Sequence, residues 1–343
     1  MPESLLLGRF CRFGLWQNVK NMQCHLLAEE WNAHFRNVIR GILRGRVVPF
    51  LGAGVNLCER SAAATSKNRL PSAAELMEYL IRQFPQYAKA TGDLKQVSQL
   101  IALDPGSGPL YAELHELLDN DYDPTDVHTM LASIPSILRS LGVSGRYPLI
   151  LTTNYDDVLE TAFKRKGETF DVITYVADGP KHGTFFHQAP DGDPRPIERP
   201  NEYRDVNVNR RSVILKMHGA VDRLRGDWDS YVITENHYIE YLTRTELAGL
   251  IPVGLAAHLR QCHFLFLGYS LRDWNLRVIL HRIWGEQKLN YVSWAIQKDP
   301  SELDRRFWIH RGVQILEREL GGYASVLHGR LRLQARKGEM SIG

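Results

Sequence analysis

Short motifs rich in glycine or polar residues follow four of the strongly apolar segments of this 343-residue sequence. They read GAGVN at 52–56, TTNYD at 152–156, MHG at 217–219 and GYS at 268–270. Glycines let a backbone approach a phosphate, an amide and a carboxylate can bind a ribose hydroxyl or a carboxamide, and a histidine can transfer protons near neutral pH. Singly, each motif is equally well explained by a tight turn, an Asx turn or a helix cap. Four such motifs at strand ends favour a ligand site.

The apolar segments that carry these motifs predict the fold class. Each is an unbroken apolar run, which is typical of a strand buried on both faces of a parallel sheet. The six runs are RVVPFLGAG, PLILTTNYD, SVILKMHG, HFLFLGYS, YVSWAIQ and the shorter GVQILE. Helical patterns such as DDVLETAFKRKG and RDWNLRVILHRIW lie between them. The order predicts an α/β protein with a Rossmann-like, doubly wound parallel sheet of about six strands.

The spacing of these runs predicts how the chain is organised. Nearly a hundred residues separate the first two strands, so we expect an inserted helical subdomain over 57–146. Residues 170–212, rich in Gly, Pro and Asp, predict an irregular insertion. A helical stripe begins near residue 25, which leaves 1–24 as an N-terminal extension, with Met22 as an alternative start; the main domain is expected over 25–343. About 25 residues follow GVQILE, too few for another domain.

Composition narrows the class of protein. The formal net charge is +3, and 31 Arg and 11 Lys are balanced by 39 acids, so no strong field favours nucleic-acid binding. The arginines over 195–211 are expected in a solvated loop. No window reaches the ~20 apolar residues of a membrane span, and we expect a cytoplasmic protein. The four cysteines, Cys11, Cys24, Cys58 and Cys262, form no C-x-x-C pair, which argues against disulfides and a structural zinc site.

The glycine motif alone does not predict a dehydrogenase. Leu57 stands where the third glycine of G-x-G-x-x-G is required. The acidic residue expected about 20 residues later is also missing, because Glu75 and Glu78 fall in a predicted helix. A dinucleotide site remains compatible with the motif, but hydride transfer is not indicated.

Taken in order, GAG, T-x-NYD, HG and a strand that ends in GYS resemble the sirtuin family, and more closely its bacterial SIR2-like branch. The resemblance covers about residues 38–320, and LKMHGAVDRLRGDWDSYVITENHYIEYL and HFLFLGYSLRDWNLRVILHRIW resemble long signatures of that branch. It implies that NAD is bound, and it implies a role for each matching position. The implied NAD-binding residues are Gly52, Ala53 and Gly54 at the pyrophosphate, Asn56 where sirtuins usually have Ser, Gly268 and Ser270 on the adenosine side, and Asp273 in the branch's extension of that motif. The implied catalytic residues are Asn154 and Asp156 at the nicotinamide ribose and carboxamide, and His218 as the base.

Departures from the sirtuin pattern shape the expected activity. The G-I-P-D-F-R signature is absent, and only Leu70-Pro71-Ser72 is similar to it. The four zinc-binding cysteines of true sirtuins are missing, so we expect neither a zinc ribbon nor any other metal. The resemblance then implies an NAD+ glycohydrolase of antiphage defence, which converts NAD to nicotinamide and ADP-ribose. Two alternatives stay open: a protein deacylase or ADP-ribosyltransferase, and a non-catalytic subunit that senses NAD or ADP-ribose.

The same resemblance implies partners rather than a built-in sensor. Proteins of this branch suggest a homo-oligomer, together with a HerA-type ATPase or an Argonaute-like protein. The sequence leaves open whether NADP replaces NAD, and whether cyclisation competes with hydrolysis.

Overall fold

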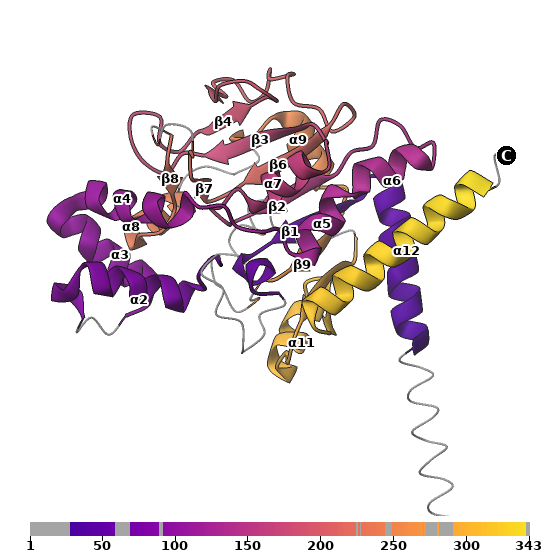
Figure 1. Cartoon of the computed structure of the whole chain (residues 1–343), viewed down its shortest axis with the longest axis horizontal. Coiled ribbons are helices and arrows are strands. Elements are labelled where there is room, and N and C mark those ends of the chain that lie inside the picture. Colours follow the sequence, from indigo (N-terminus) through magenta and orange to yellow (C-terminus); the bar gives the residue numbers. More distant parts are fainter. Residues whose placement is uncertain are drawn as a thin grey trace, which may run out of the picture.

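A nine-stranded sheet, seven strands of which are parallel, forms the centre of the computed structural model (Figure 1). The structure describes residues 28–58, 69–88, 92–223, 226, 228–243, 249–269, 271, 280 and 291–340. The strand order is β11-β10-β9-β1-β2-β6-β3-β4-β5. The six predicted strands are all present, as β1 (Val47–Leu51), β2 (Leu149–Thr152), β6 (Ser212–Lys216), β9 (His263–Leu267), β10 (Ser293–Gln297) and β11 (Val313–Glu317). The predicted doubly wound α/β fold is therefore confirmed.

The position of β1 in this order decides where a ligand can bind. From β1 the chain first moves to β2 on one side, and much later it returns to β9 on the other side. Val47 through Leu51 pair in parallel register with residues 263 to 267 of β9, and Phe50 pairs with Leu151 of β2. In doubly wound sheets the crevice at such a reversal of direction, outside the carboxyl ends of the strands, is the usual ligand site.

The segment predicted to be irregular contains three further strands, so that prediction was wrong. β3 (Phe170–Tyr175) pairs in parallel with β6, and β4 (Phe185–Gln188) and β5 (Arg195–Pro196) continue the sheet in antiparallel fashion. Side chains of β3 alternate between half-buried and buried along the strand. A strand covered on one face only shows alternation instead of an apolar run, which is why a search for unbroken runs missed it.

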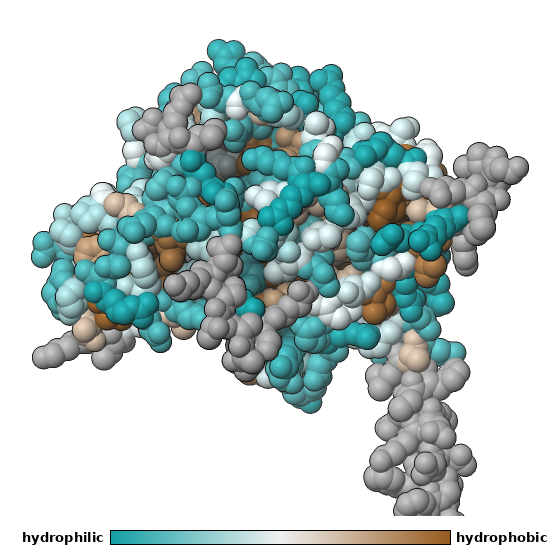
Figure 2. Space-filling view, viewed as in Figure 1, coloured by the Kyte–Doolittle hydropathy of each residue, from teal (hydrophilic) through white to brown (hydrophobic). Residues whose placement is uncertain are grey.

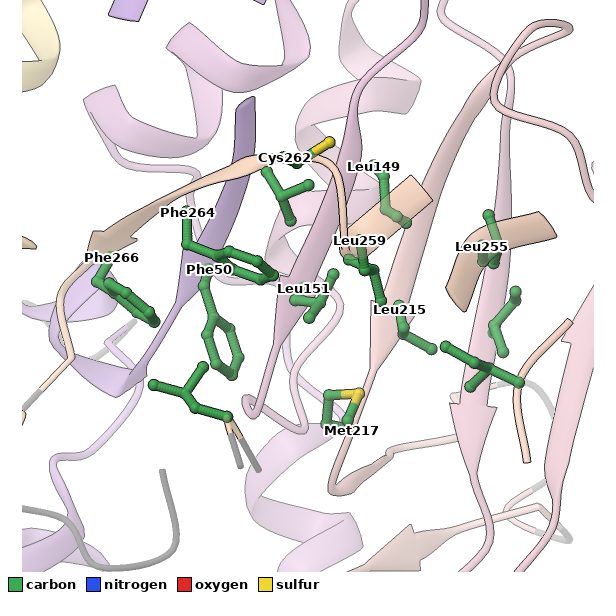
Figure 3. Close-up of a cluster of buried hydrophobic side chains, with 14 of the residues drawn as sticks. Phe50, Leu149, Leu151, Leu215, Met217, Leu255, Leu259, Cys262, Phe264 and Phe266 are labelled. Atoms are coloured by element: carbon green, nitrogen blue, oxygen red, sulfur yellow. The ribbon is translucent and has the colours of Figure 1, made fainter. Parts of the chain in front are cut away.

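Helices cover both faces of the sheet and bury two separate cores. On one face, α8 (Glu235–Thr243), α9 (Val253–Leu259) and α11 (Glu302–Ile309) cover a cluster that includes Phe50, Phe264 and Phe266 (Figure 3). On the other face lie the helix over 28–43, α5 (Asp126–Ala132), α6 (Ile134–Ser140), α7 (Val158–Arg165) and α12 (Leu320–Met340). Figure 1 shows α12 crossing the helix over 28–43 at one end of the molecule.

The inserted helices form a lobe with its own core at the opposite end of the molecule (Figure 1). The lobe contains α2 (Ala73–Gln83), α3 (Leu94–Ile101) and α4 (Ser107–Leu118), with a π-helical turn, η3 (Ala102–Gly106), between the last two and a short η2 (Pro85–Tyr87) after α2. Ser72 begins α2 with a capping box, because its hydroxyl accepts from Glu75 N and its own N donates to the Glu75 carboxylate. The lobe core also includes Tyr231 of the two-stranded hairpin β7 (Gly219–Ala220) and β8 (Ser230–Tyr231).

The lobe is shorter than the predicted insertion over 57–146. Its core runs from Leu70 to Tyr122 along the inserted segment, whereas α5 and α6 pack on the sheet. Both sets of helices are amphipathic, so periodicity alone could not separate them.

Further observations concern the surface and the parts of the chain outside the described residues. No helix in the described part of the chain is long and apolar enough to cross a membrane. Figure 2 shows a largely hydrophilic face with hydrophobic patches over the lobe and beside α12. The predicted extension over 1–24 and the predicted helix in RDWNLRVILHRIW, apart from Leu280, lie outside the described residues.

Candidate functional site

The loops that follow β1 and β9 are in direct backbone contact at the reversal point of the sheet. Gly52 N donates to Leu267 O (3.1 Å) and Gly54 N donates to Gly268 O (2.8 Å). A Cβ on Gly54 would lie 2.6 Å from Gly268 O, and a Cβ on Gly268, whose φ is +65°, would lie 2.2 Å from Val55 N. Both glycines are therefore required by the approach of the two loops, whatever the ligand.

The β1 loop continues as a short 3-10 helix, η1 (Ala53–Leu57), which places Asn56 beside the end of β2. Asn56 Nδ2 donates to Asp156 Oδ2 (2.9 Å). The other carboxylate oxygen, Asp156 Oδ1, accepts from Val158 N (3.2 Å) at the start of α7. Asp156 is 7% exposed. Its carboxylate thus ties the glycine loop to the first turn of α7, and both its oxygens already have a protein partner.

Asn154 lies between these two loops. Its backbone N donates to Thr152 Oγ1 (3.0 Å), which fixes the turn after β2. Its side-chain Nδ2 donates to Gly52 O across a long 3.4 Å contact. The carboxamide oxygen of Asn154 belongs to a half-buried side chain at the carboxyl end of the sheet. Sequence reasoning placed Asn154 and Asp156 on one side of the sheet edge, and both contact residues of the β1 loop.

His218 follows β6, which is the neighbour of β2. Thr152 of β2 pairs with Lys216 of β6, so Asn154 and His218 each lie two residues beyond a paired position at adjacent strand ends. The imidazole is 3% exposed and packs edge-on against Tyr238 (5.6 Å between centroids) and Tyr241 (5.5 Å) of α8. Its Nε2 has no hydrogen-bond partner within the described part of the chain.

Burial determines the protonation state of this imidazole. Desolvation lowers the pKa of His218 to about 3, because the cation would lose its hydration without gaining a partner. The side chain is therefore neutral at physiological pH. The sequence suggested a group that exchanges protons near pH 7; in its buried setting His218 is instead a neutral imidazole.

Lys216 is a buried residue of the site region that sequence reasoning missed. It is 1% exposed, and its Nζ donates to Asp156 O (2.5 Å) and Glu160 Oε1 (2.8 Å). It thereby holds the turn that carries Asp156. A signal was available, since a lysine inside the apolar run SVILKMHG must find a partner when the strand is buried on both faces.

Tyr155 was missed as well, although it stands inside the TTNYD motif. Its hydroxyl donates to Val232 O (2.8 Å), and its own carbonyl accepts from Val221 N (3.0 Å). Its ring packs edge-on against Tyr231 of the lobe core. Tyr155 therefore joins the strand end to the hairpin β7–β8, and its alternation with Asn154 and Asp156 could have indicated a side chain on the opposite face.

Of the remaining predicted site residues, two lie within the described part of the chain and two lie outside it. Ala53 is exposed in the first turn of η1, and Gly268 meets the glycine loop as described above. Ser270 and Asp273 lie outside the described residues. Among the residues that the structure describes, no group of three or more His, Cys, Asp or Glu side chains could hold a metal ion. Cys58 and Cys262 are buried and form no disulfide, while Cys11 and Cys24 fall outside the described ranges.

Comparison with known proteins identifies the domain. The sequence profile of the SIR2-like domain matches residues 148–316. This chain carries a SIR2-like domain. The matched segment begins just before β2 and includes Asn154, Asp156, His218 and Gly268, so the predicted resemblance to the SIR2-like family is confirmed there. The glycine loop at 52–56 lies upstream of the match.

Curated relatives of the SIR2-like chain share low identity with it. Defense-associated sirtuin 2 of Bacillus subtilis is 24% identical over 174 residues, which are 49% of this chain and 14% of that protein. Two proteins named NAD(+) hydrolase ThsA also match. The one from Acinetobacter baumannii is 30% identical over 161 residues (47% of this chain, 25% of the relative), and the one from Bacillus cereus is 25% identical over 198 residues (54% and 31%). The chain thus spans less than a third of the length of each of these relatives.

Proposed function

We propose that this SIR2-like chain is an NAD+ glycohydrolase, which cleaves NAD to nicotinamide and ADP-ribose. The observation that carries the proposal is the neutral imidazole of His218, whose Nε2 has no hydrogen-bond partner among the described residues, at the strand end adjacent to that of Asn154. A neutral imidazole can take up a proton at the ring nitrogen that carries no hydrogen, and an amide beside it can orient a hydroxyl or a water. The relatives named NAD(+) hydrolase support the choice of substrate.

The proposed roles follow from the position of each side chain. Cleavage of the bond between nicotinamide and ribose leaves positive charge on the ribose, which nearby carboxylate oxygens stabilise. Asp156 supplies that carboxylate, and Asn56 keeps it in one orientation. Asn154 orients the ribose and the attacking water, whose proton passes to Nε2 of His218 as its oxygen bonds to the ribose carbon. The backbone around Gly52, Ala53, Gly54 and Gly268, with Ser270 and Asp273, is proposed to hold the phosphates and the adenosine.

The two alternative activities use the same residues. A deacylase or ADP-ribosyltransferase would replace water with a nucleophile of a second protein, and a sensing subunit would bind NAD or ADP-ribose without cleaving it. The buried Nε2 of His218 has no hydrogen-bond partner among the described residues, and a proton taken from the attacking water would occupy it, which favours the enzyme over the sensor. The absence of the sirtuin zinc cysteines from the sequence favours water over acylated lysine.

The biological role is proposed from the relatives as well. One of them is a defence-associated sirtuin, so we propose that this chain depletes NAD in bacterial antiphage defence. An NAD-consuming effector must be inactive until it is triggered. We therefore propose that a homo-oligomer, or a HerA-type ATPase or Argonaute-like partner, controls the activity.

Nicotinamide release from NAD tests the enzyme directly. The purified chain, with and without the products of neighbouring genes, is incubated with NAD, and nicotinamide and ADP-ribose are quantified by chromatography. Asn154→Ala and His218→Ala are expected to lower release at least a hundredfold, in line with the loss of a positioning group or a general base. Asn201→Ala and His310→Ala, which remove the same side-chain types from exposed positions, are the matched controls and should retain the wild-type rate.

Each alternative gives a distinct outcome in the same assay. Release that requires an acylated peptide would replace the glycohydrolase by a deacylase. Binding of NAD without release under any condition would make the chain a sensor. Release that neither Asn154→Ala nor His218→Ala alters would refute the proposed mechanism.

A further inference from the structure

A second pocket lies on the α7 side of the sheet, behind the turn that carries Asp156. Its volume is about 500 Å³. α7 and the residues just before it form one wall, strands β3 and β4 form another, and the loop over 189–194 and residues 220–223 border it. None of the residues that the NAD proposal uses lines this pocket.

The pocket has the size and the wall chemistry of a small-molecule site. Val172 and Thr174 of β3 and Val176 just after it line the pocket, and Phe186 of β4 packs against Trp228 at a centroid distance of 5.0 Å. Trp228 is 45% exposed although it is a large hydrophobic residue. Pockets of roughly 300–1,000 Å³ with apolar walls and a few polar groups are the usual form of sites for organic ligands.

The charged side chains that line the pocket indicate which class of organic ligand it can bind. Among the described residues, six carboxylates and three basic side chains line it: Asp157, Glu160, Glu168, Asp191, Asp193 and Asp222 against Lys164, Lys216 and Arg223. Three of these carboxylates have a basic partner. Glu160 pairs with Lys216 and Asp157 with Arg223, and Glu168 pairs with Arg139, which lies outside the lining. The excess of negative charge attracts cations and repels phosphates, which separates this pocket from any NAD or ADP-ribose site.

The floor of the pocket provides a specific acceptor. Glu160 is 7% exposed, and only one of its two carboxylate oxygens, Oε1, meets Lys216. The second oxygen, Oε2, is buried and has no hydrogen-bond partner among the described residues. A buried carboxylate oxygen without a donor is unfavourable, and a ligand N–H would satisfy it.

We propose that this pocket binds a small organic cation, with its ammonium or guanidinium group toward Glu160 and an apolar body against β3, Phe186 and Trp228. The aromatic pair contributes cation–π attraction or stacking. Lys216, which holds the turn of Asp156, is shared with the NAD site region, but none of the proposed NAD-binding or catalytic residues lines the pocket. The proposal does not depend on the glycohydrolase activity.

Three indoles that differ in charge test the proposal on the full chain by calorimetry. Tryptamine is a cation, tryptophol is neutral and indole-3-acetate is an anion. We expect tryptamine to bind at least tenfold more tightly than tryptophol, and indole-3-acetate not to bind up to millimolar concentration. Raising the salt concentration should weaken tryptamine binding severalfold. Equal affinity for the three indoles, or no binding of tryptamine at millimolar concentration, overturns the proposal.

Variants separate the pocket from adventitious binding. Thr174→Trp fills the pocket from a half-buried wall position and should abolish tryptamine binding, whereas Leu333→Trp on the exposed face of α12 should leave it unchanged. Glu160→Gln should weaken tryptamine binding at least tenfold, but this substitution also removes the carboxylate partner of Lys216. Asp193→Asn therefore provides a second charge variant, at the exposed rim of the pocket. Asp205→Asn is the matched control outside the pocket. Binding that survives Thr174→Trp places tryptamine elsewhere and refutes the site. Preference for a short arginine-rich peptide over tryptamine would replace the small molecule by a protein partner.

Discussion

Asn56 Nδ2 donates a hydrogen bond to Asp156 Oδ2 at 2.9 Å, across one hundred residues of sequence. Asn56 belongs to η1 after β1, and Asp156 precedes α7 after β2. The bond therefore joins two strand-end loops that must keep a fixed separation if they are to hold one ligand. Because Asp156 also accepts from Val158 N, the carboxylate is held in a single orientation.

Replacing Asn56 with Asp should break this link and introduce repulsion between two carboxylates. We expect the free energy of unfolding at pH 7 to fall by about 1–3 kcal/mol, since a donor is lost and a like charge is gained. Urea denaturation measures the change. Asn56→Ala removes the donor without adding charge, so the difference between the two variants at pH 7 isolates the repulsion. An Asn56→Asp variant that is as stable as Asn56→Ala would show that the two carboxylates do not face each other.

The contact between the β1 and β9 loops predicts a strong effect of one methyl group. Gly268→Ala places a Cβ 2.2 Å from Val55 N at a residue whose φ is +65°. We expect a loss on the order of 2–4 kcal/mol in the free energy of unfolding, from backbone strain together with the steric clash.

Gly108→Ala is the matched control for this substitution. Gly108 lies in α4, where a Cβ added to it would have nothing within 4 Å, so alanine there should be neutral or should stabilise by about 0.5–1 kcal/mol. Thermal denaturation of both variants provides the comparison. Equal effects of the two substitutions would contradict the close approach of the two loops.

Buried histidines predict acid sensitivity of the fold. Burial lowers the pKa of His218 to about 3 and that of His128 to about 4, from 6.5. The unfolded chain therefore binds more protons than the folded chain below pH 6.5. The stability that the neutral imidazoles provide is fully present above pH 6.5 and decreases as the pH falls toward 4, with a slope of up to about 1.4 kcal/mol per pH unit for each imidazole. Urea midpoints between pH 7.5 and 4.5 measure the slope, and His218→Gln should reduce it by the contribution of one proton.

The ion pair between Lys216 and Glu160 predicts a non-additive response. Both side chains are buried, so Lys216→Met leaves a carboxylate without its cation and should cost about 3–5 kcal/mol. Lys216→Met combined with Glu160→Met removes both charges and should recover most of that loss. A double-mutant cycle measures the coupling. Additive effects of the two substitutions would mean that water replaces the missing partner.

Particular residues show how much of the fold and of the candidate site could be predicted from the sequence. The apolar runs located all six predicted strands, because burial on both faces of a parallel strand leaves a signal in every residue. β3 was missed because Val172 and Thr174 face the second pocket rather than a helix. The polar residues at the strand ends could be predicted once the strands were located, because the carboxyl ends of parallel strands meet at one edge of the sheet.

The finer properties of the site depend on three-dimensional neighbours. Nothing in the local sequence of His218 indicates Tyr238 and Tyr241, whose packing makes the imidazole neutral. The bond from Asn56 to Asp156 depends on the adjacency of β1 and β2, and it was not predicted even though both residues were. Spacing identifies which side chains gather at an edge, whereas their partners and charge states are set by contacts between distant segments.

The order of the strands also affects how the chain folds during its synthesis. β1 pairs with β9 along its whole length, yet more than two hundred residues separate the two strands in the chain. During synthesis β1 leaves the ribosome before β9, so one edge of β1 has no strand to pair with until residues 263–267 follow. A nascent chain that stops short of β9 lacks the second wall of the crevice. Any chemistry performed there is consequently withheld until that late strand has been made and has docked.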